Sequence, residues 1–156
     1  MAAHAVLTPR TSCLLLAIAS VAVLASVFAF QYLGGAAPCQ MCIWQRYPYV
    51  VLIVLGLIGA YWQPRLMLGL GTVVLLVGGG IAIYHYGVEE GWFALPAGCT
   101  AGGDATSVEE LRKMLSEAPP ACDQVRFNVF GWSLAAWNIL ASAVLAGLTG
   151  FAALKR

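Results

Sequence analysis

Residues 11–32 read TSCLLLAIASVAVLASVFAFQY, a run of apolar and small residues without a charged side chain. A helix needs about 20 such residues to cross the hydrocarbon core of a bilayer. Three further apolar runs follow, at about Ile43–Trp62, Leu66–Tyr86 and Phe127–Leu154. Only 10% of the chain is charged, against about a quarter in soluble domains. The sequence therefore predicts an all-α membrane protein, a four-transmembrane-helix bundle in which residues 1–156 form a single domain.

The positions of the cations predict the orientation of these helices. Arg10 precedes the first run, Arg65 lies in the short turn between the second and third, and Lys155-Arg156 follow the fourth. All 7 Asp and Glu residues fall in the one long polar loop, residues 87–126. Because positively charged loops stay in the cytoplasm, we expect both termini there and the long loop outside. The first run exceeds the apolar core of about 7–15 residues in a cleavable signal peptide, so we expect it to remain as a helix.

The long polar loop contains the signals of a short helix. Ser107-Val-Glu-Glu110 is a capping box, in which the serine oxygen accepts a hydrogen bond from a free backbone amide and the glutamate reaches back. Pro119-Pro120 would end this helix. Its apolar residues share one face, so it would lie either in the plane of the lipid headgroups or in solvent. In the first case it would hold Cys99 and Cys122 close to the membrane.

The motif Cys39-Gln-Met-Cys42, just before the second run, is typical of a redox-active dithiol. The amides at a helix start stabilise a thiolate, and we expect Cys42 to feel this field most. Arg46 follows one helical turn later on the same face, where its charge would also favour a Cys42 thiolate. The alternatives are a static disulfide, which stabilises little across so short a loop, and an arginine that only anchors the helix at the interface. No metal site is predicted, because thiolate zinc sites need four ligands.

A second cysteine pair, Cys99 and Cys122, lies in the long loop on the same side of the membrane. A merely structural disulfide there would stabilise the fold by about 3–4 kcal/mol. Two separated dithiols on the oxidising side instead suit electron transfer from a soluble protein to a lipid-soluble acceptor, and we favour that role. Cys13, near the cytoplasmic end of the first run, is expected to be a small buried side chain.

Polar residues at two further places are candidates for the site. His85 lies where the third run leaves the membrane, so it would either bond a quinone carbonyl and relay protons or have an interfacial role only. Glu89 and Glu90 are expected to be solvated. Asn138 is a single amide within the fourth run, expected to bond a neighbouring helix. A net charge of +1 without a basic stripe predicts no nucleic acid binding.

Three motifs carry a resemblance to a known family. They are Cys39-Gln-Met-Cys42-Ile-Trp-Gln-Arg46, Tyr84-His85-Tyr86-Gly87-Val88-Glu89, and Cys122-Asp123-Gln-Val-Arg126 followed by Gly131-Trp-Ser-Leu-Ala-Ala-Trp-Asn138. With the four apolar runs and the two outward cysteine pairs, they resemble the DsbB family of disulfide bond formation proteins over nearly the whole chain. Members of that family reoxidise the periplasmic oxidase DsbA and pass the electrons to a membrane quinone.

The resemblance implies a role for each cysteine of the two pairs. Cys99 and Cys122 would receive electrons from a reduced DsbA-like oxidase with a thioredoxin fold, and Cys99 would form the mixed disulfide with it. Cys39 would exchange with the long-loop pair, and Cys42 would contact the quinone. The protein would then be a protein-disulfide:quinone oxidoreductase.

The resemblance also implies the cofactor and the location. The quinone would be ubiquinone or menaquinone, Arg46 would stabilise the Cys42 thiolate beside it, and His85 is a further candidate for quinone contact. The chain would lie in the bacterial inner (cytoplasmic) membrane with both cysteine pairs and the short loop helix in the periplasm. Met41 stands where leucine is common in the family, an exchange of similar apolar side chains.

Three other functions fit parts of this pattern. A quinone reductase resembling vitamin K epoxide reductase would also have four helices and two cysteine pairs, but it places them in the reverse order. A non-enzymatic membrane protein would hold two structural disulfides. A specialised homologue would serve a dedicated DsbA-like partner instead of the general one.

Overall fold

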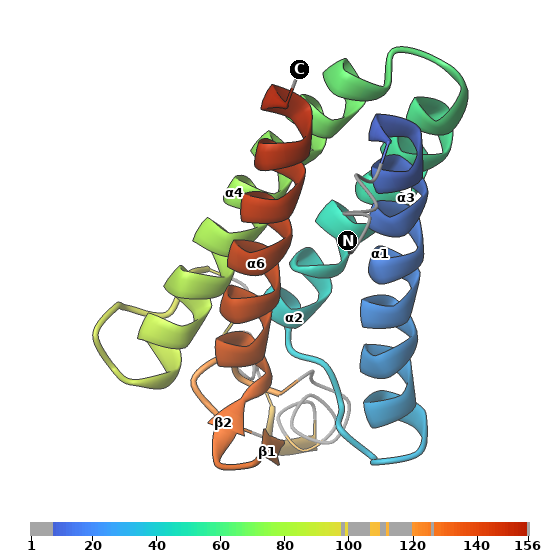
Figure 1. Cartoon of the computed structure of the whole chain (residues 1–156). Helices are drawn as coiled ribbons and strands as arrows, with labels where there is room; N and C mark the ends of the chain where they lie inside the picture. Colours follow the sequence, from blue (N-terminus) through green and yellow to red (C-terminus); the bar gives the residue numbers. More distant parts are fainter. Residues whose placement is uncertain are drawn as a thin grey trace.

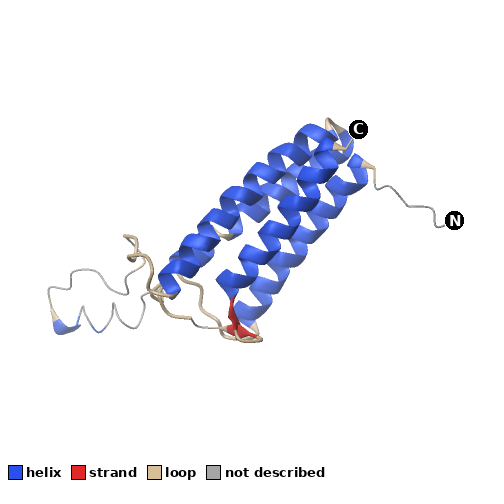
Figure 2. Ribbon diagram, turned by 60° about the vertical axis from the view of Figure 1, so that its left-hand side comes forward, coloured by secondary structure: helices blue, strands red, loops and turns tan. Residues whose placement is uncertain are grey.

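The computed structural model describes residues 8–97, 99, 107–109, 112, 120–125 and 127–155. Within these residues, four helical segments are long and apolar enough to cross a membrane. They are α1 (Pro9–Tyr32), α2 (Gln40–Trp44) continued by α3 (Arg46–Tyr61), α4 (Pro64–Glu89) and α6 (Leu134–Leu154). The four segments lie side by side as a bundle (Figures 1 and 2). The predicted fold is confirmed.

Local chemistry explains where the first and third segments begin. The hydroxyl of Thr8 accepts a hydrogen bond from the backbone amide of Thr11 at 3.2 Å, so Thr8 caps α1. Pro64 opens α4, where a missing N–H costs nothing. The preceding Gln63 has φ 46°, and this left-handed residue turns the chain sharply between α3 and α4. The two helices therefore become antiparallel neighbours.

The second membrane segment is interrupted at Gln45, between α2 and α3. Pro48 has no N–H to give to the carbonyl of Trp44, and its ring crowds that carbonyl. The amide of Gln45 instead bonds the carbonyls of Met41 and Ile43. The interruption separates α2, which carries the cysteine motif, from α3 and places Gln45 at the joint.

Close helix contacts build the core at one end of the bundle. The most extensive contacts are those of α4 with α6 and of α1 with α3. A Cβ atom on Gly56 of α3 would lie only 2.6 Å from the carbonyl oxygen of Cys13 in α1, so only glycine permits this approach. Leu52, Leu68 and Cys13 belong to the same cluster and are completely buried. The expectation for Cys13 is confirmed.

The fourth membrane segment begins later than the apolar run suggested. Residues 128–133 form a hairpin in which β1 (Asn128–Val129) pairs antiparallel with β2 (Trp132–Ser133). Phe130 and Gly131 both have positive φ, which suits a two-residue turn between twisted strands. Ser133 then caps α6 by accepting a bond from the amide of Ala136. The helix therefore starts at Leu134 and not near Phe127.

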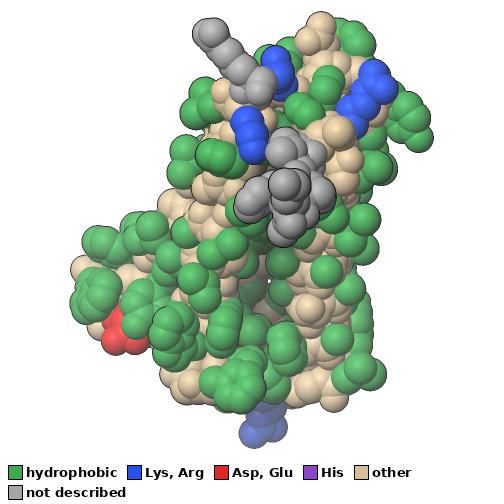
Figure 3. Space-filling model, viewed as in Figure 1, with side chains coloured by type: hydrophobic (Ala, Val, Ile, Leu, Met, Phe, Trp, Pro, Cys, Tyr) green, Lys and Arg blue, Asp and Glu red, His purple; other side chains and the backbone are tan. Residues whose placement is uncertain are grey.

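Charged side chains divide between the two ends of the bundle. Figure 3 shows most of the basic side chains at the end that carries the C-terminus and the α3–α4 turn, with acidic ones toward the other end. The cysteine motif, the hairpin and the described parts of the long loop lie at the second end (Figure 1). Of the helix predicted after Ser107, Val108, Glu109 and Arg112 are helical. Its remainder, residues 110, 111 and 113–119, lies outside the described residues.

Candidate functional site

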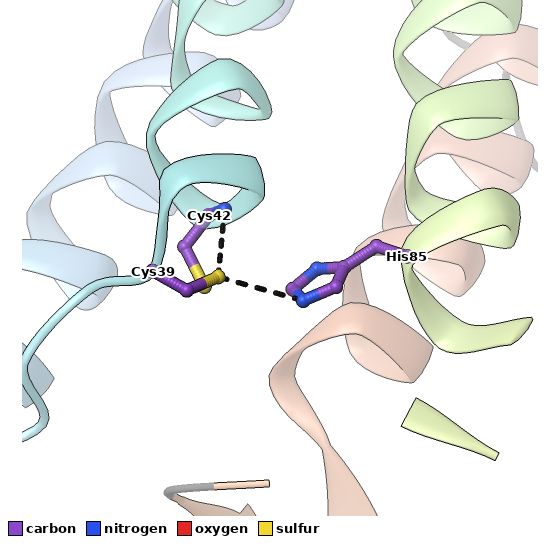
Figure 4. A group of neighbouring side chains, drawn as sticks. All are labelled: Cys39, Cys42 and His85. Atoms are coloured by element: carbon purple, nitrogen blue, oxygen red, sulfur yellow. Dashed lines mark hydrogen bonds between the residues drawn. The ribbon is translucent and has the colours of Figure 1, made fainter. Parts of the chain in front are cut away.

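The first cysteine pair forms the start of α2 (Figure 4). Cys39 is the N-cap, and its sulfur accepts a hydrogen bond from the backbone amide of Cys42 at 3.1 Å. Both residues are free thiols, Cys39 buried and Cys42 half-buried. The pair is therefore not a static disulfide in this structure. The sulfur that receives the helix amide belongs to Cys39.

His85 of α4 faces this pair across the bundle (Figure 4). Its Nε2 lies 3.5 Å from the Cys39 sulfur and 3.8 Å from Glu89 Oε1. Its Nδ1 lies 2.6 Å from the side-chain nitrogen of Gln45. An amide nitrogen only donates, so with the Gln45 amide in this orientation Nδ1 is the acceptor, and the proton of a neutral ring lies on Nε2. His85 is 3% exposed, which excludes the alternative of a surface histidine.

These contacts stabilise a thiolate on Cys39. The hydrogen bond from the Cys42 thiol is the largest cause that lowers the pKa of Cys39, and the hydrogen bond from His85 adds to it. Burial opposes them but does not restore the ordinary value. From the sequence we expected the thiolate on Cys42. The structure favours Cys39, because the Cys42 thiol, the His85 ring and the backbone amide of Cys42 all donate to its sulfur.

The second cysteine pair forms a disulfide. Cys99 and Cys122 are joined with a Cα–Cα distance of 5.2 Å, and both are almost fully buried. They pack in one apolar cluster with Cys39, Met41 and Val88. The structure therefore brings the two cysteine pairs together. Cys99, the expected contact of a partner protein, is only 2% exposed in this state.

A cavity of about 440 Å³ lies beside the first pair. Apolar residues of α1, α3 and α6 and of the segment before β1 form much of its wall. The polar, thiol and charged side chains that line it from the helices and the cysteine motif are Ser26, Cys39, Cys42, Gln45, Arg46, Tyr49, His85, Glu89 and Asn138. Its volume is within the range of about 300–1,000 Å³ found for small-molecule sites. All the candidate ligand-binding residues from the sequence thus line one cavity.

Arg46 lies on the wall of this cavity, at the start of α3. Its guanidinium carbon is 4.9 Å from the centre of the Phe28 ring, so it stacks on an aromatic face. Its Nε is buried and has no hydrogen-bond partner among the described residues. A buried donor without a partner costs free energy. Arg46 therefore has a donor available for a polar group in the cavity.

Glu89 is buried and not solvated as the sequence suggested. Its side chain is 7% exposed at the end of α4. One carboxylate oxygen, Oε1, faces His85, and Ser133 also bonds this carboxylate. The other oxygen, Oε2, is buried without a partner among the described residues. The error arose because Glu89 was assigned to the polar loop, whereas α4 continues through it.

Comparison with known proteins identifies the family of this chain. The sequence model of the family described as "Disulfide bond formation protein DsbB" matches residues 9–152. The chain belongs to the DsbB family.

Similar relatives carry the name "Disulfide bond formation protein B". The protein of Polaromonas naphthalenivorans is 32% identical, with 95% of this chain and 92% of the relative covered. That of Polaromonas sp. (strain JS666) is 31% identical with the same coverage. That of Actinobacillus pleuropneumoniae serotype 5b is 29% identical over 88% of this chain and 81% of the relative. No solved structure matches.

Membership of the DsbB family fixes the general nature of the protein. It is a multi-pass membrane protein with an oxidoreductase role in disulfide bond formation, in a family generally associated with quinones and thiol-oxidase partners. The match decides against the vitamin K epoxide reductase alternative. It also decides against a non-enzymatic membrane protein.

Sequence reasoning missed a chain of side chains behind His85 in this DsbB-family protein. Tyr49 donates to Oδ1 of Asn138, Nδ2 of Asn138 donates to Oε1 of Gln45, and Nε2 of Gln45 donates to His85. The expected helix-to-helix bond of Asn138 is thus confirmed. One feature of the sequence could have indicated Gln45. It is a polar side chain within an apolar run, four residues before Tyr49 and so on the same face of a helix.

Sequence reasoning also missed that a third ligating group joins the first cysteine pair. The sulfurs of Cys39 and Cys42 and a ring nitrogen of His85 all lie within 4.8 Å of one another. The sequence had argued against a metal site because thiolate zinc sites need four ligands, and these three groups are one short of that number. In the hydrogen-bonded arrangement described above, the nitrogen that faces the sulfurs donates to Cys39.

Proposed function

We propose that this protein reoxidises a periplasmic DsbA-type oxidase by thiol–disulfide exchange and passes the electrons to a membrane quinone. The observation that carries the proposal is the cluster of both cysteine pairs beside a cavity within the bundle. Exchange requires a thiolate to approach a disulfide sulfur, and Cys39 belongs to the same buried cluster as Cys99 and Cys122. The same motif borders the cavity through both of its thiols.

The cavity fits a quinone ring. Its wall is largely apolar, as a lipid-soluble ring requires, and the unpaired Nε of Arg46 offers a donor for a carbonyl oxygen. Cys42, Arg46 and His85 are the residues that would hold the ring. When bound, a quinone takes up the two electrons and two protons that a dithiol releases as it becomes a disulfide.

The two cysteine pairs differ in whether their sulfurs are bonded. The long-loop pair is a disulfide and the Cys39–Cys42 pair is reduced. This is the distribution expected after a loop dithiol has reduced the Cys39–Cys42 disulfide through a mixed disulfide with Cys39. That exchange conserves electrons: the two thiols of the loop become a disulfide, and the two sulfurs of the motif become thiols.

The orientation follows from the separation of charges. Arg10, Arg65 and Lys155 mark one end of the helices and both cysteine pairs lie at the other. By the positive-inside tendency, we place the termini in the cytoplasm and the cysteine pairs in the periplasm of a bacterial inner membrane. A DsbA-type partner would then reach the long loop from outside. Because Cys99 is buried, the loop must open for a mixed disulfide to form.

Turnover with purified components tests the proposal. Protein in detergent would receive a reduced DsbA-type oxidase and a ubiquinone analogue, and quinone absorbance would report turnover. Cys42→Ser should abolish quinone reduction while the helical content and the Cys99–Cys122 disulfide remain. Cys13→Ala, a matched cysteine substitution at the other end of the bundle, should retain turnover. Full turnover by Cys42→Ser would contradict the proposal.

A further inference from the structure

Four hydrogen bonds form a directed chain that ends on the reactive sulfur. They run from Tyr49 to Asn138, from Asn138 to Gln45, from Gln45 to His85 and from His85 to Cys39. Each side chain donates to the next. The chain crosses from α3 to α6, back to the joint between α2 and α3, and then to α4. Buried polar groups are costly unless paired, so these contacts constrain one another.

The orientation of each amide in the chain is determined by its neighbours. Two hydroxyl groups, those of Tyr49 and Ser142, donate to Oδ1 of Asn138. The amide nitrogen of Asn138 must therefore point to Gln45, whose oxygen accepts it. This leaves the nitrogen of Gln45 to face Nδ1 of His85 at 2.6 Å. Because amide nitrogen has no lone pair to offer, Nδ1 of the ring has to accept.

We propose that Gln45 and Asn138 are positioning residues that hold His85 as the Nε2–H tautomer and so direct its proton at the Cys39 sulfur. A neutral imidazole carries one proton, and the bond at one nitrogen decides which nitrogen bears it. With Nδ1 occupied as an acceptor, the proton lies on Nε2, 3.5 Å from the sulfur. Cys39 belongs to the buried cluster that also contains Cys99 and Cys122, so the directed donor lies where the two cysteine pairs meet.

The opposite tautomer would require every member of the chain to turn. A proton on Nδ1 needs the oxygen of Gln45 as its acceptor, which turns the Gln45 amide and then the Asn138 amide by half a turn. Tyr49 would lose its acceptor on Asn138 and would donate to Ser142, 3.3 Å away. Nε2 would then be an acceptor facing the sulfur, unable to stabilise a thiolate. The amides therefore link the hydroxyl groups of the core to the charge on Cys39.

Nitrogen-15 NMR of histidine-labelled, reduced protein in detergent tests the tautomer directly. The chain has 2 histidines, and His4→Gln leaves His85 as the single signal. The two ring nitrogens give different shifts when protonated or not, so the spectrum identifies the tautomer. We expect the Nε2–H form in the parent protein. Asn138→Leu, which leaves Gln45 free to turn, should give a mixture of both tautomers although Asn138 does not contact His85.

Two further variants make this test decisive. Gln45→Met removes the donor itself and should give the same mixture. Gln40→Met is the matched control, a glutamine at the start of α2 without a described bond to His85, and it should leave the Nε2–H form unchanged. Helical content and the Cys99–Cys122 disulfide would confirm folding. A pure Nε2–H spectrum in folded Asn138→Leu or Gln45→Met would overturn the inference.

The pH dependence of Cys39 alkylation, located by mass spectrometry, gives a second readout. The titratable or charged groups around this sulfur are Cys42, Arg46, His85 and Glu89. Losing the directed proton should move the midpoint of alkylation to higher pH in Asn138→Leu and Gln45→Met, but not in Gln40→Met. An unchanged midpoint in both variants would also overturn the inference.

The inference rests on the proposed function in one respect only: that the charge on Cys39 matters for electron transfer. Neither the NMR spectrum nor the alkylation profile involves a quinone or a partner protein. If the tautomer does not respond, the exchange between the cysteine pairs stands. If Cys42→Ser retains turnover while the tautomer responds as expected, the proposed function fails and the role of the amides stands.

Discussion

Cys13 and Cys39 are both buried cysteines of one small bundle, yet their surroundings differ in kind. Cys13 of α1 is completely buried, with its sulfur facing Gly59 of α3. Its thiol donates weakly to the carbonyl of Pro64 at 3.5 Å. Cys39 is 4% exposed, but an amide, a second thiol and His85 all point at its sulfur. Burial by itself therefore does not produce a reactive thiol. Donors directed at the sulfur produce it.

The largest difference between the two cysteines should appear in turnover. Cys39→Ala should abolish it, because the loop dithiol then has no disulfide to reduce, and Cys99 and Cys122 should accumulate as thiols once a reduced partner is added. Cys13→Ala should leave turnover at the parent level. Acid quenching and thiol alkylation, followed by mass spectrometry, measure the redox state of each pair. An oxidised loop pair in Cys39→Ala after addition of the reduced partner would contradict the relay.

Arg46 and Arg65 lie at opposite ends of the bundle, and their substitution should affect the KM for quinone differently. Arg46→Ala should raise the apparent KM for quinone by about tenfold to a hundredfold, since a hydrogen bond from a charged donor contributes about 1.5–3 kcal/mol. Arg65→Ala, at the α3–α4 turn, should leave that KM unchanged. Steady-state rates at several quinone concentrations check this. An unchanged KM for Arg46→Ala would reduce Arg46 to an anchor at the membrane interface.

The donors around Cys39 should be visible in its pH dependence. A lowered pKa means that the Cys39 thiolate persists as the pH falls below the ordinary thiol value of about 8.5 and disappears only near the lowered pKa. His85→Ala removes one donor and should raise the midpoint of Cys39 alkylation by about 1–2 pH units, from about 1.5–3 kcal/mol for a bond to a charged group. Cys13 should remain unmodified in both proteins. A midpoint insensitive to His85→Ala would show that Cys42 and the helix amide suffice.

The smallest expected effect concerns packing at the Cys13 end. Gly56→Ala would place a methyl group 2.6 Å from the carbonyl oxygen of Cys13, and such overpacking costs about 1–3 kcal/mol. Gly69→Ala, where a methyl group meets nothing within 4 Å, should be neutral or slightly stabilising. Thermal unfolding in detergent measures both. Turnover per folded molecule should be unchanged in each, and a loss of turnover without loss of stability would mean that the two ends are coupled.

The sequence was a good guide to the four membrane helices and the position of the cysteine pairs. Length and hydrophobicity act along the chain, so the apolar runs and the motif could be located directly. It was a poorer guide to which sulfur is the better acceptor, because α2 begins at Gln40, ahead of the apolar run, and Cys39 is therefore its N-cap. The hairpin before α6 also escaped notice, since its aromatic residues read as part of an apolar run.

Contacts between helices were the least predictable part of the site. The bonds from Asn138 to Gln45 and from Gln45 to His85 depend on how each helix is rotated about its own axis. The sequence indicated that Asn138 needs a partner but did not identify it. Glu89 was misplaced for a similar reason: its burial follows from the hairpin that covers the end of α4.

The burial of the Cys99–Cys122 disulfide has a consequence for which reductants can react with it. Thiol exchange requires in-line access to a sulfur, and both sulfur-bearing residues are at most 2% exposed. We therefore expect small thiols in the surrounding medium to reduce this bond far more slowly than they reduce an exposed disulfide. Only a protein that binds well enough to expose the disulfide would react with it. Burial would therefore prevent unrelated thiols from reducing the Cys99–Cys122 disulfide and consuming quinone without oxidising the partner protein.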